Sequence, residues 1–445
     1  MSAAGLGARL QAAYGFSARP SWSRELSRAV EEVCRRHGLD AGTLHGRLDA
    51  EPHLLDELAG LVTVGETYFY RHPSDIQHAV SIITALLAGR SAEEPCVVWS
   101  AGCASGEEPY TLAMELDRRL GAAAPARVRI LATDVNSDAL AKARAGIYSA
   151  WSFRGVGTEL RERYFLPLQP NAWQVAPRLL ERIAWHRSGL AQHAATMASG
   201  SVDVIFFRNV AIYLEADALA QLYRQFRRVM RPGGTLYVAS ADPFPPRELF
   251  TRVAAPGVAA FRPADDDARL PVAPPPSGPV PGAPPQRHDV KVPPPAPVTR
   301  VAATPAPDAP PPGGGVALAL AEARRLADRG ELAEALALVS RAALTDPLSA
   351  DVALLCGQLH VATGELTEAT SALRRAVYLA PGGMLHRYWY ASALAAAGDR
   401  ARARQMLLDV ERQLAARGAA ERVEDQQTTV EELADSARFL RESLS

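Results

Sequence analysis

The chain has 445 residues, which is enough for two or three domains, and its composition is that of a globular protein. Its formal net charge of −1 offers no bulk positive field, so nucleic-acid substrates are disfavoured. The four cysteines form no CxxC pair and have no zinc-like histidine spacing, so we expect free thiols and no metal site. Without a basic, apolar leader pattern or an apolar run of ~20 residues, we expect a cytoplasmic protein with no membrane insertion.

Residues 1–61 are predicted to form a small helical domain. Apolar residues recur with helical spacing from Leu26 to Val33, and Gly38 suits the end of that helix. The segment 41–61 has the same period. Two interpretations stay open for this domain, a packing cap without a direct function and a docking module.

Residues 62–71 place three consecutive aromatic side chains, 68–70, between Thr67 and Arg71. A core strand explains only some of them, because successive side chains of a strand point to opposite faces. A lining for a flat ring or a sulfonium would explain the others. Core packing and ligand lining are both compatible with the pattern.

Residues 97–110 predict a buried strand, a tight turn of small residues around Gly102, and a helix. In an open α/β sheet, this arrangement binds nucleotide-like ligands. Glu107 and Glu108 would repel a pyrophosphate, but they suit a ligand with an ammonium group and hydroxyls, such as S-adenosylmethionine (SAM). The simpler alternative is an ordinary turn with two solvated glutamates that the helix dipole favours.

Residues 128–135 read as a second buried strand that ends in an acid. Asp134 is a candidate acceptor for ribose hydroxyls, and it is also a candidate cap for the helix predicted at 137–145. The two roles are compatible. The segment 147–185 is rich in aromatic residues, proline and arginine, and we interpret it as an insertion on the sheet.

A third strand, 201–207, runs into Arg208 and Asn209 at the predicted cleft. A helix at 216–230, a Pro-Gly-Gly stop and a further strand at 235–240 follow. Strands that alternate with helices in this way predict a parallel, Rossmann-like α/β sheet.

The last third of the chain contains a linker and an internal repeat. Prolines crowd residues 263–315, which we interpret as a disordered linker. Beyond it, Gly330, Gly364 and Gly398 recur at intervals of 34 residues. This period is typical of tetratricopeptide repeats, which are helical hairpins that stack and bind peptides or proteins. A dimerisation or stabilising module is the alternative.

Four sequence blocks, in this order, resemble the CheR-type chemoreceptor glutamate O-methyltransferases of the subgroup with a tetratricopeptide extension. The blocks are ETYFYR at 66–71, WSAGCASGEEPY at 99–110, ATD at 132–134 with ARAGIY at 143–148, and FRNVAIY at 207–213. The resemblance implies SAM-dependent methyl ester formation on glutamate side chains in the cytoplasmic domain of methyl-accepting chemoreceptors. It also implies the following division: a helical domain (1–61), a methyltransferase domain (62–262) with an inserted β subdomain (147–185), the linker (263–315), and the repeats with a terminal helix (316–445).

The resemblance further implies the site residues. Arg71 and Tyr213 would lie beside the transferred methyl group. Cofactor contacts would come from Thr67, Arg71, Gly102, Glu107, Asp134, Gly189, Leu190, Arg208 and Asn209. The family usually has asparagine where this chain has Gly65 and Gly189, so side-chain contacts there would be lost or supplied by backbone.

Two competing interpretations remain. One is a non-catalytic SAM-binding scaffold in which the repeats do the work, and the other is a methyltransferase for a small molecule or nucleic acid. The presence of Arg71 and Tyr213, which a scaffold does not need, favours the enzyme. The sequence does not identify the receptor, the methylated glutamates, the oligomeric state or the partner of the repeats.

Overall fold

The computed structural model describes residues 3–18, 22–63, 65–154, 156, 158–169, 171–255, 258–264, 314–419, 421–424 and 428–444. Met1–Ala264 and Val316–Ser445 together form one compact unit. The predicted linker, 263–315, lies almost entirely outside the described residues. Among the described residues, no helix combines the length and apolar character needed to span a bilayer, and no cluster of three metal-ligating side chains occurs.

The N-terminal segment is helical, as its periodicity predicts. Its helices are α1 (Ala3–Tyr14), α2 (Trp22–His37), α3 (Ala41–Arg47) and α4 (Pro52–Val62). Leu26, Ala29 and Val33 of α2 are buried in one apolar cluster with the other three helices, which is the stripe expected of an amphipathic helix. Asn136, just beyond strand β2 (Val128–Asp134) of the central sheet, donates to the carbonyl of Gly60 (2.9 Å) and so ties this segment to the sheet.

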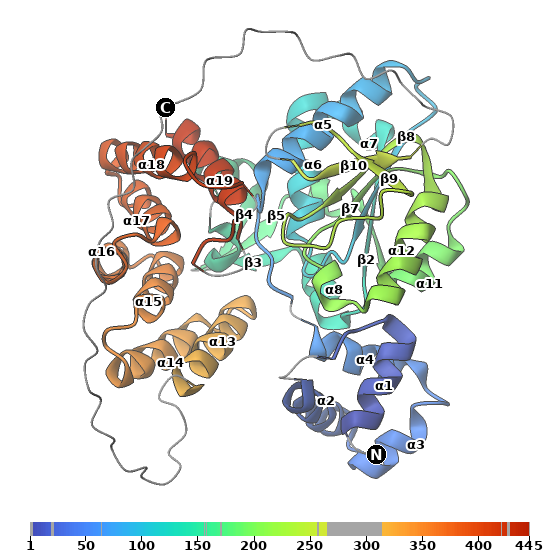
Figure 1. The fold of residues 1–445 in the computed structure, drawn as a ribbon, viewed down its shortest axis with the longest axis horizontal. Coiled ribbons are helices and arrows are strands. Elements are labelled where there is room, and N and C mark those ends of the chain that lie inside the picture. The colour runs from blue at the N-terminus through green and yellow to red at the C-terminus, as the bar shows by residue number, and fades with distance from the viewer. Residues whose placement is uncertain are drawn as a thin grey trace, which may run out of the picture. The chain divides into compact units, whose positions relative to one another are not determined.

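The centre of the fold is a seven-stranded, mostly parallel sheet with the order β6-β2-β1-β7-β8-β10-β9 (Figure 1). The strands are β1 (Cys96–Ala101), β2 (Val128–Asp134), β6 (Ile183–Arg187), β7 (Val202–Phe207), β8 (Met230–Val238), β9 (Phe250–Arg252) and β10 (Ala260–Pro263). β2 and β6 lie on one side of β1 and β7 lies on the other, so the strand order switches between β1 and β7. Ligands bind at such a switch point in open α/β sheets.

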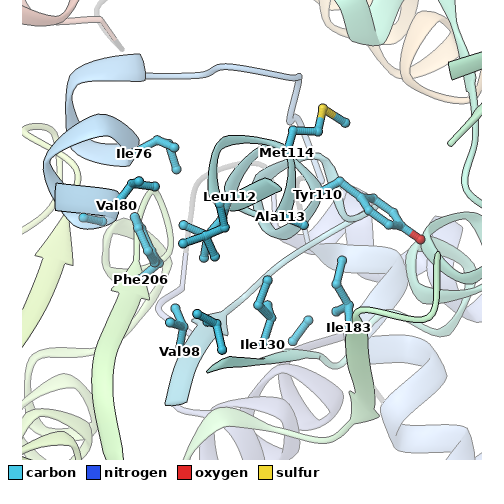
Figure 2. Packing of buried hydrophobic residues seen from close by; sticks show 14 of the residues in the cluster. Ile76, Val80, Val98, Tyr110, Leu112, Ala113, Met114, Ile130, Ile183 and Phe206 are labelled. Carbon is cyan, nitrogen blue, oxygen red and sulfur yellow. The ribbon is translucent and has the colours of Figure 1, made fainter. Parts of the chain in front are cut away.

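Both faces of this sheet are covered, which explains why its strands are continuous apolar runs. On one face, Val98, Ile130 and Phe206 pack against α5 (Pro73–Ala88) and α6 (Glu107–Leu120) (Figure 2). On the other face, the alternate residues Trp99 and Ile205 pack against residues of α11 (Leu190–Thr196) and α12 (Ala216–Val229). The remaining helical elements of this domain are η1 (Gly121–Ala123), α7 (Ala124–Arg127), α8 (Ser137–Ala145), η2 (Ala150–Phe153), α9 (Thr158–Tyr164), α10 (Pro177–Leu180), α11 (Leu190–Thr196), η3 (Ala211–Tyr213) and α12 (Ala216–Val229).

The predicted insertion contains a separate three-stranded antiparallel sheet, with β3 (Ile147–Ser149), β5 (Ala172–Val175) and β4 (Phe165–Gln169) in that order. The predicted end at residue 185 needs correction, because β6 pairs in parallel with β2 and belongs to the central sheet. The strand predicted at 235–240 also begins earlier. The Pro-Gly-Gly sequence lies inside β8, where the register with β7 shifts and Gly233 has a φ of +77°.

The C-terminal part is all-helical, and its helices are paired at the predicted period (Figure 1, orange to red). The pairs are α13 (Gly314–Asp328) with α14 (Leu332–Thr345), α15 (Ala350–Thr363) with α16 (Leu366–Leu379), and α17 (Met384–Ala396) with α18 (Arg400–Leu414). Gly330, Gly364 and Gly398 turn each pair with φ values of +85°, +83° and +87°. The terminal helix α19 (Val430–Ser443) starts with a capping box formed by Thr429 and Glu432. This arrangement is consistent with tetratricopeptide repeats.

Candidate functional site

A cavity of about 370 Å³ lies where β1, β2 and β7 end, as its lining residues Gly102, Asp134 and Arg208 indicate. Its volume is within the range of small-molecule sites. All the residues proposed for the site from the sequence line this cavity, with the exception of Glu107: Thr67, Arg71, Gly102, Asp134, Gly189, Leu190, Arg208, Asn209 and Tyr213. Residues that lie far apart in the sequence therefore line the same cavity.

The turn after β1 brings backbone close to the cavity. Gly102 has a φ of +85°, and its N–H and that of Cys103 both donate to the carbonyl of Thr133, at 2.8 and 3.1 Å. A Cβ atom at Gly102 would lie 2.5 Å from Cγ2 of Val210, which lines the cavity. Glycine is required here by both the backbone conformation and the close approach.

Asp134 is fixed at the end of β2 by backbone donors. Its Oδ2 accepts from the N–H of Ala104 (2.8 Å) and its Oδ1 from the N–H of Asn136 (2.9 Å). Burial raises the pKa of Asp134, and these backbone N–H groups act against that rise. A carboxylate held in this way can accept further hydrogen bonds from a vicinal diol. The alternative cap role falls to Asn136, whose side chain accepts from the N–H of Ala139.

The two adjacent glutamates have different surroundings, and the choice of Glu107 as a cofactor contact needs correction. Glu107 is fully buried, where it accepts from the hydroxyls of Ser105 (2.7 Å) and Ser152 (2.9 Å), and it does not line the cavity. Glu108 does line it, and accepts from the hydroxyl of Ser100 (2.7 Å). Successive side chains of a helix point in different directions, so only one of these two glutamates can face the cavity. Their adjacent positions in the sequence do not show which one.

Arg208 joins three segments that surround the cavity. Its guanidinium lies 3.3 Å from the carboxylates of both Asp75 and Glu108, and its Nη2 donates to the carbonyl of Arg71 (2.7 Å). Burial raises the pKa of Asp75 to about 7, while the charge of Arg208 acts in the opposite direction. Because Arg208 is itself buried, these contacts hold the loop of Arg71 and the start of α6 in register.

Arg71 and Tyr213 line the same cavity from opposite ends of the domain sequence. Nη1 of Arg71 donates to the carbonyl of Glu66 (2.8 Å), and its guanidinium carbon lies 5.8 Å from the centroid of the Tyr68 ring. Burial lowers the pKa of Arg71, but Tyr68, Glu66 and other acidic groups outweigh it, and the pKa is raised. Arg71 is therefore a permanent cation at this wall.

The three aromatics at 68–70 divide their roles. Phe69 packs in the core against Tyr148, and Tyr70 donates to Glu115 (2.7 Å). Tyr68 alone of the three lines the cavity. The sequence could not separate them because this segment is irregular rather than a strand.

Sequence reasoning missed two parts of the site. Tyr14 and Phe16 of the N-terminal segment stack with ring centroids 5.6 Å apart and line the cavity, so this domain is neither a mere cap nor only a docking module. Their aromatic character within an alanine-rich segment was the available signal. Asp242 accepts from the N–H of Asn209 (2.6 Å), which has a φ of +58°, and burial raises the pKa of Asp242 to about 6. Its sequence context gave no signal.

The donor set fits SAM. Asp134 matches the ribose diol, Glu108 matches a group with positive charge, and the ring of Tyr68 matches a flat or cationic group. Gly65 and Gly189 also line the cavity, as backbone rather than as side chains. Gly189 precedes α11 with extended backbone (φ −65°, ψ 150°).

Comparison with known proteins agrees with this geometry. A family model described as "CheR methyltransferase, SAM binding domain" matches residues 65–257. The chain is 29% identical over 433 residues to "Probable biofilm formation methyltransferase WspC" of Pseudomonas aeruginosa PAO1, covering 92% of this chain and 97% of the relative. It is 29% identical over 403 residues to the protein of that name in Pseudomonas putida KT2440, covering 86% and 91%.

A second group of relatives matches about half of the chain. "Chemotaxis protein methyltransferase Cher2" of Pseudomonas putida KT2440 is 26% identical over 230 residues, covering 49% of this chain and 81% of the relative. The cofactor of the matched domain is SAM. Residues 65–257 thus match the CheR-type SAM-dependent methyltransferase domain, and the C-terminal helices are consistent with a tetratricopeptide extension.

Proposed function

We propose that this chain transfers a methyl group from SAM to glutamate side chains in the cytoplasmic domain of a chemoreceptor-like protein, which then carries methyl esters. The observation that carries the proposal is the cavity at the strand switch, which Arg71 and Tyr213 line together with Asp134 and Glu108. The names of the relatives, a biofilm formation methyltransferase and a chemotaxis methyltransferase, support a role in a chemosensory pathway.

The chemistry makes few demands on the protein. When bound, SAM supplies a methyl group on a positively charged sulfur. A glutamate with an ordinary pKa of about 4.3 is already an anion at neutral pH, so the acceptor needs no general base. The residues of the chain have to align the acceptor and exclude water, and alignment of this kind is worth several kcal/mol.

Arg71 and Tyr213 are the candidates for that alignment. Arg71 already donates through Nη1 to the carbonyl of Glu66, so only part of its guanidinium can face an acceptor. One-sided contact of this kind orients a carboxylate without the full bidentate pairing that would weaken it as a nucleophile. Tyr213 would hold the acceptor by a hydrogen bond from its hydroxyl.

The test is transfer of radiolabelled methyl from SAM to membranes that contain the host's own chemoreceptors. We expect base-labile label on a receptor band with the wild type and at least a 100-fold lower rate with Arg71→Ala. Arg129→Ala is the matched control, because Arg129 is exposed near the start of β2 and does not line the cavity.

Calorimetric titration with SAM, run on the same three proteins, separates cofactor binding from transfer. If the wild type binds SAM but labels no receptor, the scaffold interpretation replaces the enzyme. If Arg71→Ala binds SAM normally and keeps full turnover, Arg71 has no role in alignment.

A further inference from the structure

A second cavity, of about 250 Å³, adjoins the SAM cavity. Glu66, Tyr68 and Arg71 line both of them. The second cavity, here called the vestibule, also has walls from the insertion, at Trp151 and Arg154, and from the C-terminal helices. Arg71, the residue proposed to align the acceptor, is thus part of the wall of both cavities.

The helices that form the outer wall are fastened to the methyltransferase domain within one compact unit. The indole N–H of Trp151 donates to Oδ1 of Asp328 (2.9 Å), at the end of α13. On the other side, Nδ1 of His72 lies 3.0 Å from Oε1 of Glu432 in α19. Phe439, also in α19, stacks on Tyr70 with ring centroids 5.4 Å apart. The vestibule is thus bounded on both sides by specific contacts.

The carboxylates of the vestibule have partners within the protein. Glu66 pairs with Arg154 (3.2 Å), and Glu432 pairs with His72. Glu424 accepts from the N–H groups at the start of α17, at 2.8 and 3.0 Å. Asp351, which is exposed, lies 4.0 Å from Nε2 of His386.

Two arginines of the vestibule wall, unlike these carboxylates, have no partner of opposite charge close by in the described part of the chain. Within the described part of the chain, neither Arg71 nor Arg324 of α13 has a carboxylate within 4 Å. Arg324 lines the vestibule together with Glu66 and acts on it electrostatically. The pair places two positive charges on the wall of the vestibule, among its carboxylates.

Aromatic and apolar side chains complete the outer wall. Tyr388 and Trp389 of α17 lie edge to face with centroids 5.6 Å apart, and Leu354 of α15 and Leu385 of α17 lie beside them. The guanidinium of Arg154 covers the Trp151 and Tyr68 rings at 4.3 and 4.5 Å. A wall of this composition suits the apolar flank of an amphipathic helix whose acidic side chain points inward.

We propose that the vestibule admits the methyl-accepting glutamate and that the C-terminal helices form half of its wall, so that the repeats recognise the acceptor directly. The occupant is an amphipathic helical segment of the receptor, whose backbone stays at the rim because about 250 Å³ holds a side chain and not a helix. This inference rests on the proposed function and adds to it the route and the chemistry of the acceptor.

Binding is the test, because it does not depend on methyl transfer. A fluorescein-labelled cytoplasmic fragment of a host chemoreceptor is titrated with the full chain in the presence of S-adenosylhomocysteine, and its anisotropy is followed. We expect Arg324→Glu to weaken binding at least fivefold and Arg324→Gln to weaken it less. Arg325→Glu, the matched control, should stay within twofold, because Arg325 does not line the vestibule and pairs with Glu322 (3.5 Å).

A second pair of variants tests the other wall. Gln358→Glu, on α15 in the vestibule, should weaken binding, whereas Gln405→Glu, exposed on α18, should not. Equal affinities for the Arg324 and Arg325 variants and for the two glutamine variants would overturn the inference. Methyl label on the receptor is scored separately with the wild type, so a failed vestibule and a failed methyltransferase give different results.

Discussion

The most direct test of the turn geometry at the cavity is the variant Gly102→Ala. An L-residue at a φ of +85° costs about 1–2 kcal/mol. The new Cβ would also lie 2.5 Å from Cγ2 of Val210, and valine has few rotamers with which to move away, so overpacking adds about 1–3 kcal/mol. We expect the free energy of unfolding to fall by about 2–5 kcal/mol and the affinity for SAM to fall at least tenfold, because displaced Val210 lines the cavity.

The chain offers a matched control at Gly364. Its φ of +83° is nearly the same, and a Cβ there would meet nothing within 4 Å. Gly364→Ala therefore measures the backbone strain alone, about 1–2 kcal/mol, with SAM binding unchanged. The loss of unfolded-state entropy on replacing glycine is common to both variants and cancels in the comparison.

Chemical unfolding followed by circular dichroism and calorimetric titration with SAM are the two assays. The double variant Gly102→Ala/Val210→Ala should recover the steric part and leave the backbone part, which a double-mutant cycle resolves. Equal destabilisation by Gly102→Ala and Gly364→Ala, with no recovery in the double variant, would refute the close approach as the reason for glycine at 102.

Further variants probe the charged groups. Asp134→Asn should weaken SAM binding roughly 10- to 100-fold by removing a charged acceptor, whereas Asp138→Asn, exposed on α8, should not; calorimetry that finds the two alike would contradict the assigned role. Glu108→Gln should weaken SAM binding about tenfold, while Glu107→Gln should mainly lower the melting temperature, and the reverse result would restore Glu107 as the contact. Burial raises the pKa of Asp242 to about 6, so between about pH 4 and 6 the folded chain keeps a proton that the unfolded chain releases. The free energy of unfolding should therefore fall as pH rises through this window, by at most about 3 kcal/mol, and urea titrations should find this component missing in Asp242→Asn.

The sequence by itself determined the order of the elements and the class of the ligand. Apolar runs buried on both faces, glycine turns and the 34-residue period are local properties. Apart from the Pro-Gly-Gly sequence, which lies inside β8, they appear in the structure where the pattern predicted them. Asp134 could be predicted because an acid at the carboxyl end of the second strand of such a sheet lies at the ligand cavity.

The tertiary structure alone decided which neighbouring side chain faces the ligand. Glu107 and Glu108 are equivalent in sequence, but packing against Ser152 of a distant segment buries the first and leaves the second on the cavity wall. Phe16 lines the cavity from the N-terminal segment, and Asp242 acts from outside it by accepting from the N–H of Asn209. Long-range packing sets such contacts, and neither periodicity nor local propensity encodes them.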